Sequence, residues 1–302
     1  MPPRIRLTPP LLNSATPWAT THSELSALYA CAHTGAVTTR TTLLHGFEHD
    51  ARVHQHTFLP EGSSLNTYGY SPYALEYYLR GVRQIVSGAA QKKPFIISIT
   101  GTPTEVSESV SRISAFAAEE EEGRDVWIEL NLSCPNIPSK PPPAYDHAEL
   151  CSYLQRLPPT ATLPIGLKTP PYTYAAQFTA LVSAIRKHAA EKIAFVTATN
   201  TLGSSLHLSD ATAPTPTLPG SGIGGLAGAA IHCLSLGNVN TLRRELDNAG
   251  LRDVTVIGVG GVSDAAGMRR MLAAGAVAVG VGTAFGREGV GIFASVLGGV
   301  SE

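Results

Sequence analysis

Residues 254–284, VTVIGVGGVSDAAGMRRMLAAGAVAVGVGTA, contain the pattern that decides the fold. The apolar run Val254–Gly258 enters a glycine turn, the amphipathic stretch Asp264–Ala274 follows, and the apolar run Val277–Val281 leads into a second glycine turn. Short apolar runs of this kind are typical of strands covered on both faces, and the longer amphipathic stretch is typical of a helix. The segment therefore predicts a strand–helix–strand unit of a parallel sheet.

The same alternation continues along the whole chain. The further strands that it predicts are Leu11–Ser14, Ala36–Thr39, Phe95–Ile99, Val126–Asn131, Leu163–Lys168 and Ala194–Thr199. The further helices that it predicts are Ser23–Ala32, Tyr73–Ala89, Glu105–Glu120, Asp146–Leu157, Tyr174–Ala190, Ala227–Asn248 and Gly289–Leu297. Eight strands alternating with eight helices favour a closed (β/α)8 TIM barrel of the α/β class, in which residues 1–302 form a single domain. An open doubly wound sheet is the alternative.

Two long insertions depart from a minimal barrel. Thr41–Pro72 and Leu202–Gly222 each follow a predicted strand, at the end where barrel enzymes assemble their active sites. Loops of this length in a compact domain are usually functional or disordered. The first insertion contains several histidines, but they lack the close spacing of metal ligands, so we expect no bound metal. These histidines are His45, His49, His54 and His56.

The composition limits the partners and the compartment. The 302 residues have a formal net charge of −1, which argues against nucleic acid and anionic membranes as partners. No apolar stretch is long enough for a membrane span, and the start of the chain does not resemble a secretory leader. None of the 4 cysteines forms a CxxC pair, and Cys31, Cys151 and Cys233 fall in helical patterns that place them in the core. We therefore expect a soluble cytoplasmic protein with reduced thiols.

Two glycine turns indicate an anion site. Gly260 and Gly261 follow the seventh predicted strand, and Gly282 and Thr283 follow the eighth. Glycines let backbone N–H groups approach an anion closely, and helix N-termini favour negative charge. Because the loops after the seventh and eighth strands of a barrel often bind phosphate, we predict a phosphate site here. Tight turns without a ligand are the alternative.

Polar groups also gather at the ends of other predicted strands. The segment Asn131–Asn136, NLSCPN, places amides and a hydroxyl around the thiol of Cys134. A thiolate can act as a general base when it is partly exposed and has a suitable pKa. Lys168 ends another apolar strand, where it could stabilise an anion such as a reduced flavin or form a Schiff base. Residues 196–201 and 64–69 could add further amides to the same pocket.

Together these segments resemble the dihydroorotate dehydrogenases, most closely the soluble class 1A enzymes that use FMN and fumarate. The resemblance covers nearly the whole chain and includes the two glycine turns. Its other motifs are ELNLSCPN (Glu129–Asn136), KPPPAYD (Lys140–Asp146), GLKTPPY (Gly166–Tyr172) and SGIGGLAG (Ser221–Gly228). It implies FMN-dependent oxidation of (S)-dihydroorotate to orotate, a step of pyrimidine biosynthesis, by a cytoplasmic homodimer with fumarate as the acceptor.

The resemblance also implies roles for individual residues. Cys134 would remove a proton from C5 of the substrate while C6 delivers a hydride to the flavin, and Lys168 and Arg40 complete the implied catalytic set. The implied substrate contacts are Asn66, Tyr68, Gly69, Tyr70, Asn131, Asn136, Asn200 and Thr201, and the backbone N–H groups near Tyr68–Tyr70 would meet the substrate carboxylate. The implied FMN contacts are Ser14, Ala15, Arg40, Asn131, Lys168, Gly225, Gly260, Gly261, Gly282 and Thr283.

Three departures from the family pattern lie near the expected flavin and substrate. Arg40 stands where the family has a lysine, Thr16 stands where it has a glycine, and a histidine-rich sequence replaces its GNPxPR segment. A planar guanidinium is not equivalent to an ammonium group. The alternative function is therefore that of a diverged FMN-dependent paralogue acting on another cyclic amide or enone. A Schiff-base aldolase using Lys168 and a non-catalytic ligand-binding barrel are further alternatives.

Overall fold

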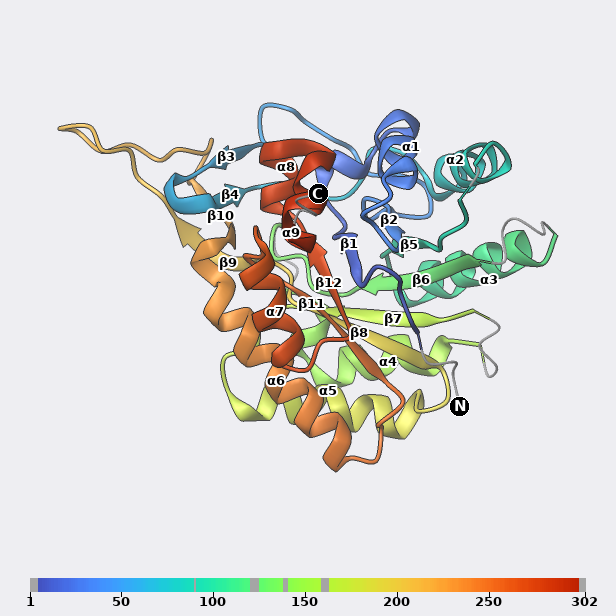
Figure 1. The fold of residues 1–302 in the computed structure, drawn as a ribbon. Helices are drawn as coiled ribbons and strands as arrows, with labels where there is room; N and C mark the ends of the chain where they lie inside the picture. Colours follow the sequence, from blue (N-terminus) through green and yellow to red (C-terminus); the bar gives the residue numbers. More distant parts are fainter. Residues whose placement is uncertain (1–4, 90, 120–124, 138–140, 159–162, 299–302) are drawn as a thin grey trace.

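Eight parallel strands close into a barrel (Figure 1). The computed structural model describes residues 5–89, 91–119, 125–137, 141–158 and 163–298. The strands run in the order β1-β12-β11-β8-β7-β6-β5-β2, and a parallel bridge between Leu12 and Ala36 joins the two ends of the sheet. Their bounds are Leu11–Asn13 (β1), Val37–Thr38 (β2), Phe95–Ile99 (β5), Val126–Asn131 (β6), Ile165–Thr169 (β7), Ile193–Ala198 (β8), Thr255–Val259 (β11) and Ala278–Val281 (β12). The predicted (β/α)8 TIM barrel is confirmed, whereas the single domain over residues 1–302 stays a prediction.

The interior of the barrel is filled with side chains. One buried cluster consists almost entirely of strand residues, among them Leu12, Ile96 and Ile257, while their neighbours along each strand pack against the helices. Phe195 is fully buried in this cluster, and Gly166 makes room for it, since a Cβ atom at Gly166 would lie 2.1 Å from the Phe195 ring. Because the interior is packed in this way, a ligand must bind at an end of the barrel.

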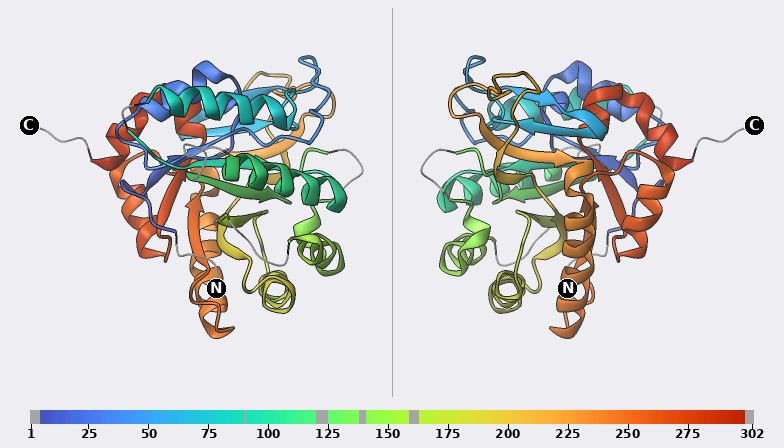
Figure 2. Two further views of the ribbon diagram at one scale, coloured as in Figure 1. Left: turned by 90° about the vertical axis from the view of Figure 1, so that its right-hand side faces the viewer. Right: turned by 90° about the vertical axis from the view of Figure 1, so that its left-hand side faces the viewer.

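Helices cover the outside of the barrel, as two further views show (Figure 2). Their bounds are His22–Ala30 (α1), Leu75–Ser87 (α2), Pro103–Glu119 (α3), His147–Arg156 (α4), Ala175–His188 (α5), His232–Asn248 (α6), Ala265–Ala273 (α7), Thr283–Glu288 (α8) and Ile292–Leu297 (α9). Local capping starts several of them. Thr21 and Glu24 form a capping box at α1, and Asp146 and Asp264 cap α4 and α7. Within the described part of the chain, no helix combines the length and apolar character needed to cross a membrane.

The two insertions contribute to a second, antiparallel sheet that the sequence did not predict. Its strands are β3 (His56–Phe58), β4 (Ser63–Asn66), β9 (Leu202–Leu206) and β10 (Ile223–Gly228), in the order β3-β4-β10-β9. These strands are short, and β4, β9 and β10 are rich in serine or glycine, so they carry no clear alternation of apolar and polar residues. The central pair, β4 and β10, joins segments that lie far apart in the sequence. Figure 1 shows this sheet near α8, with the connection between β9 and β10 projecting from the body.

Two predicted helices begin more than two residues away from where the structure has them. The helix predicted over Ala227–Asn248 begins only at His232, because β10 continues to Gly228, whose φ of 78° ends the strand before a short 3-10 turn. The helix predicted over Gly289–Leu297 is the shorter α9, and α8 precedes it directly after β12. Gly289 separates the two with a φ of 68°. The sequence did not predict α8, because this short helix lies between Gly282 and Gly289, and closely spaced glycines also indicate a turn.

Candidate active site

A large cavity lies at the carboxyl ends of the barrel strands. It encloses about 1120 Å³, including its solvent-open mouth, and its wall contains residues that end or follow seven of the barrel strands. The second sheet supplies the rest of the wall through residues such as Ser64 and Gly228. The cavity is thus formed between the barrel mouth and the second sheet, at the end where barrel enzymes place their active sites.

The cavity brings together all but one of the residues that the sequence and the resemblance indicated. Those on its wall are Ser14, Ala15, Arg40, Asn66, Tyr68, Gly69, Tyr70, Asn131, Cys134, Asn136, Lys168, Asn200, Thr201, Gly260, Gly261, Gly282 and Thr283. The exception is Gly225, which packs behind Thr201, since a Cβ atom there would lie 2.2 Å from the Thr201 hydroxyl oxygen. Gly228, from the same glycine-rich motif, stands on the wall instead.

Cys134 follows β6 and is partly exposed to the cavity. Burial raises the pKa of its thiol above the ordinary value of 9.0. The backbone N–H of Asn136 and the positive charge of Lys168 oppose this rise in the pKa of Cys134, and the Tyr70 hydroxyl and Arg40 oppose it further. The thiolate, which is the basic form, is therefore stabilised by several groups of the site and becomes more abundant as the pH rises.

The other cysteines were all expected in the core, and this expectation is wrong for one of them. Cys31 and Cys151 are partly buried and pack against the main core. Cys233 is exposed, because it lies on the outer side of the first turn of α6. All of these cysteines carry free thiols.

Tyr70 contributes its side chain to the site, whereas the resemblance implied only backbone contacts from Tyr68 to Tyr70. The side chains of Thr100 and Cys134 both act on its hydroxyl: Thr100 lowers the pKa of Tyr70, and Cys134 raises it. The ring meets Phe47 edge-on, with 5.7 Å between the ring centres. Burial raises the pKa of Tyr70, so the phenol stays protonated and can donate to the thiolate.

Four asparagines hold one another in place around the thiol. On one side, Asn200 Nδ2 donates to Ser133 Oγ at 2.9 Å, and Ser133 Oγ donates to Asn131 Oδ1 at 2.7 Å. On the other side, Asn136 Nδ2 donates to Asn66 Oδ1 at 3.0 Å. These contacts fix the orientation of each amide, so their remaining N–H and C=O groups form a preorganised pattern for a ring that carries both donors and acceptors.

Arg40 places a buried positive charge at the cavity. Only 7% of its surface is exposed, and the ion pairs among the described residues do not include it. Its guanidinium lies 3.5 Å from Thr20 Oγ1, 3.4 Å from the Gly69 carbonyl oxygen and 5.2 Å from the centre of the Tyr68 ring. Burial lowers the pKa of Arg40. A buried guanidinium with such long contacts has donors left for an anionic ligand.

Lys168 reaches across the barrel mouth. It lies in β7 and is 3% exposed, and its Nζ donates to Ser14 Oγ at 3.1 Å. Ser14 follows β1, and β1 and β7 are not neighbours in the sheet. The lysine therefore lies inside the barrel mouth, where it lines the same cavity as Cys134 and the glycine turns.

The two glycine turns leave backbone donors and space for a ligand. Gly260 and Gly261 have φ values of 135° and 70°, which favour glycine, and among the described residues the N–H groups of residues 261–263 find no protein acceptor. A Cβ atom at Gly282 would meet only Thr16 Cγ2, at 3.7 Å. Thr16 Oγ1 is itself buried and has no hydrogen-bond partner in the described part of the chain, and Thr16 lines the cavity. Such free donors suit a phosphate.

Comparison with known proteins agrees with this geometry. A family model described as dihydroorotate dehydrogenase matches residues 3–302. The chain belongs to the dihydroorotate dehydrogenase family. It is 32% identical over 284 residues to "Dihydroorotate dehydrogenase (fumarate)" of Trypanosoma cruzi strain CL Brener, covering 94% of this chain and 86% of that protein. The expected family and its class, the oxidoreductases, are thereby confirmed.

Other relatives carry similar names. The "Putative dihydroorotate dehydrogenase A (fumarate)" of Streptococcus equi subsp. equi strain 4047 is 30% identical over 283 residues, 94% of this chain and 85% of that protein. The "Dihydroorotate dehydrogenase (fumarate)" of Trypanosoma brucei brucei is 34% identical over 236 residues, 78% of this chain and 71% of that protein. Each match therefore spans most of this chain and most of the relative.

Two aromatic residues that line the cavity were not assigned to the site from the sequence. Trp18 and His56 line the cavity and meet edge-on, with 5.4 Å between ring centres. His56 Nδ1 lies 3.1 Å from the Tyr68 hydroxyl, and a Cβ atom at Gly286 would lie 2.2 Å from the Trp18 ring. Trp18 lies in a 3-10 helix of three residues and His56 lies in the short strand β3. The packing of α8 and of the second sheet brings both side chains to the wall.

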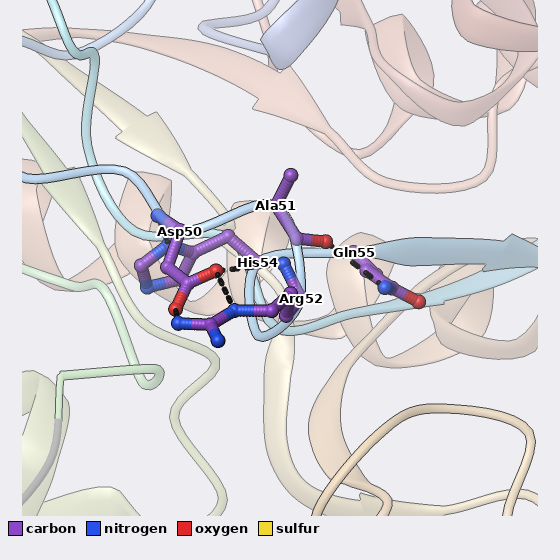
Figure 3. Close-up of polar contacts among 5 residues, drawn as sticks. All are labelled: Asp50, Ala51, Arg52, His54 and Gln55. Carbon is purple, nitrogen blue, oxygen red and sulfur yellow. Dashed lines mark hydrogen bonds and ion pairs between the residues drawn. The ribbon is translucent and has the colours of Figure 1, made fainter.

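Within the histidine-rich insertion, residues 50–55 form a turn that is held by polar groups of the same residues (Figure 3). The Asp50 carboxylate accepts two hydrogen bonds from the Arg52 side chain, at 3.1 and 2.8 Å, and the Asp50 N–H donates to His54 Nδ1 at 2.9 Å. Gln55 Nε2 donates to the Ala51 carbonyl oxygen at 2.9 Å. In the part of the chain that the structure describes, no group of side chains could hold a metal ion.

Proposed function

We propose that the chain oxidises (S)-dihydroorotate to orotate with FMN as cofactor and fumarate as electron acceptor. Family membership and the names of the relatives support this reaction. The observation that carries the proposal is that one cavity joins the Cys134 thiol, four asparagines and two buried cations to a pair of glycine turns. A base, an amide-lined pocket and a phosphate cradle are the parts that this reaction needs.

The wall of the cavity fits FMN. The free N–H groups of residues 261–263 and the open space beside Gly282 would accept the phosphate, and the unpaired hydroxyl of Thr16 would gain a partner. Lys168 would lie beside the flavin ring and stabilise negative charge there. FMN, when bound, supplies the hydride acceptor of the oxidation.

Cys134 is the base in this proposal. Its thiolate takes the proton from C5 of dihydroorotate while the C6–H bond is broken, and the proton then resides on Sγ. Asn136 N–H, Lys168, Tyr70 and Arg40 favour the thiolate over the thiol, although burial leaves the pKa of Cys134 raised. The asparagines around it orient the ring so that C5 faces the sulfur.

Arg40 is the proposed partner of the substrate carboxylate. Dihydroorotate and fumarate both carry carboxylates. The guanidinium of Arg40 is buried and has no ion pair with any residue that the structure describes, so an approaching carboxylate would stabilise it. The same residue can therefore serve both half-reactions. The lysine that the family has at this position would supply the charge but not the planar pair of donors.

Anaerobic spectroscopy of the purified protein tests the proposal. We expect a yellow protein whose flavin absorbance is bleached by dihydroorotate and restored by fumarate. A protein without bound flavin would contradict the cofactor. A bound flavin that dihydroorotate leaves oxidised would instead contradict the substrate and favour another cyclic amide or enone.

We further propose that the protein is a homodimer in the cytoplasm. Three large apolar side chains are exposed on β9, β10 and their connection: Leu206 (49%), Leu208 (43%) and Ile223 (44%). Exposed apolar groups on an edge strand favour association, and free thiols are typical of a reducing compartment. Light scattering should give twice the chain mass of 31.7 kDa, and Leu206→Glu with Leu208→Glu should give the monomer mass.

A further inference from the structure

His232 links the first glycine turn to two helices. It is the first residue of α6, and its Nδ1 lies 2.8 Å from the carbonyl oxygen of Gly260. Its other ring nitrogen, Nε2, accepts a hydrogen bond from Nε of Arg270 at 3.1 Å, and Arg270 lies in the last turn of α7. Neither His232 nor Arg270 is on the cavity wall, whereas Gly260 is. The imidazole thus acts from behind the turn.

The two contacts of His232 are satisfied together by one tautomer of its ring. A carbonyl oxygen only accepts, so Nδ1 of His232 carries the hydrogen that it donates to Gly260. A guanidinium only donates, so Nε2 must offer its lone pair to Arg270. Both partners therefore require the same neutral tautomer. Arg270 orients the ring so that its N–H points at the carbonyl oxygen.

Holding this carbonyl also sets the direction of a donor. In a trans peptide the C=O and the following N–H point in opposite directions, so turning the Gly260 carbonyl toward His232 turns the Gly261 N–H away from it. Gly261 lines the cavity, and its N–H has no protein acceptor among the described residues. A Cβ atom at Gly261 would lie 2.7 Å from His232 Cβ and 2.8 Å from the Gly228 carbonyl oxygen, so the turn packs directly on the start of α6.

We propose that His232, oriented by Arg270, is a positioning residue that aims the Gly261 N–H at the phosphate of FMN. This inference rests on the proposed FMN binding. His232 itself does not touch the ligand, so its contribution is to the affinity for the phosphate and not to the chemistry at the flavin ring. A flavin without a phosphate should therefore not benefit from His232.

The affinities for FMN and for riboflavin, compared across variants, test this role. FMN affinity is measured by fluorescence on dilution of the holoenzyme, and riboflavin affinity by its displacement of FMN. His232→Asn keeps a donor near the position of Nδ1, and His232→Gln keeps an acceptor near the position of Nε2 but loses that donor. Arg270→Met removes the orienting contact, and Arg269→Met is the control, since Arg269 is exposed on the same helix.

We expect the preference for FMN over riboflavin to fall about tenfold in His232→Gln, as for the loss of one hydrogen bond to a binding group, and to be largely retained in His232→Asn. Arg270→Met should lower it by a smaller factor, and Arg269→Met should leave it unchanged. An unchanged preference in His232→Gln, or an equal loss of affinity for both flavins, would overturn the inference alone. A wild-type protein that binds no FMN would overturn the proposed function as well.

Discussion

Gly282 is a position where a methyl group would enter the cavity at little cost to folding. A Cβ atom there would have only Thr16 Cγ2 within 4 Å, at 3.7 Å, and the φ of −114° at Gly282 is negative, so it lies outside the left-handed region that favours glycine. We therefore expect Gly282→Ala to change the free energy of unfolding by less than about 1 kcal/mol, because the lost cap preference and the reduced chain entropy oppose each other.

The same methyl group should weaken FMN binding strongly. It occupies space where we place the phosphate, and an inserted methyl in a well-packed contact costs about 1–3 kcal/mol, which corresponds to a roughly 5- to 150-fold rise in the Kd for FMN. The Kd is measured by flavin fluorescence, and the free energy of unfolding by urea denaturation of protein without bound flavin. Gly282→Ala should thus raise the Kd for FMN while leaving the free energy of unfolding nearly unchanged.

Two matched glycine variants calibrate this result. Gly237 lies inside α6 with no atom within 4 Å of a Cβ, so Gly237→Ala should stabilise the fold by about 1 kcal/mol and leave the Kd unchanged. Gly261 has a φ of 70° and lies against His232, so Gly261→Ala should lose both stability and FMN. If Gly282→Ala binds FMN as tightly as the wild type, this turn is not the phosphate cradle.

Three further changes test the groups around the base and the ligands. Tyr70→Phe removes a contact that lowers the pKa of Cys134, so labelling of Cys134 by iodoacetamide should begin at higher pH. Tyr145→Phe, which lies away from the cavity wall, is the control, and an unchanged pH dependence in Tyr70→Phe would contradict the contact. Thr16→Val should raise the Kd for FMN about three- to tenfold, and Thr16→Ser should not. The same Kd in both variants would show that the Thr16 hydroxyl does not bind FMN. Arg40→Met should weaken orotate binding, measured from the flavin spectrum, by about tenfold or more while FMN is retained, and Arg40→Lys should recover part of it.

The barrel could be predicted because each of its strands is marked locally. Runs such as Phe95–Ile99 and Thr255–Val259 are mostly apolar and are followed by polar residues or glycine, and both strands are buried along their whole length, as parallel strands should be. The second sheet has no such mark. Ser63–Asn66 and Ile223–Gly228 become strands by pairing with each other and with β3 and β9, and that pairing is a property of the folded chain.

In the candidate site, too, the residues with a local mark in the sequence could be predicted, and those placed by tertiary packing could not. Cys134 and Lys168 were predictable because they stand at strand ends, where the barrel geometry alone brings side chains together. Trp18 and His56 reach the wall through tertiary packing of α8 and the second sheet, so no local pattern marked them. The hydroxyl of Tyr70 was missed for a related reason, since its contact with Cys134 depends on how the insertion folds back over the barrel mouth.

The rate at which dihydroorotate reduces the bound flavin without oxygen, in wild type and in Cys134→Ala, tests the role of Cys134 most directly. We predict that Cys134→Ala retains FMN but is reduced about 10²- to 10⁴-fold more slowly, which is the usual contribution of a general base. In the wild type the rate should still be rising at alkaline pH, because burial raises the pKa of Cys134. Flavin reduction at the wild-type rate in Cys134→Ala would contradict the assignment of this thiol as the base.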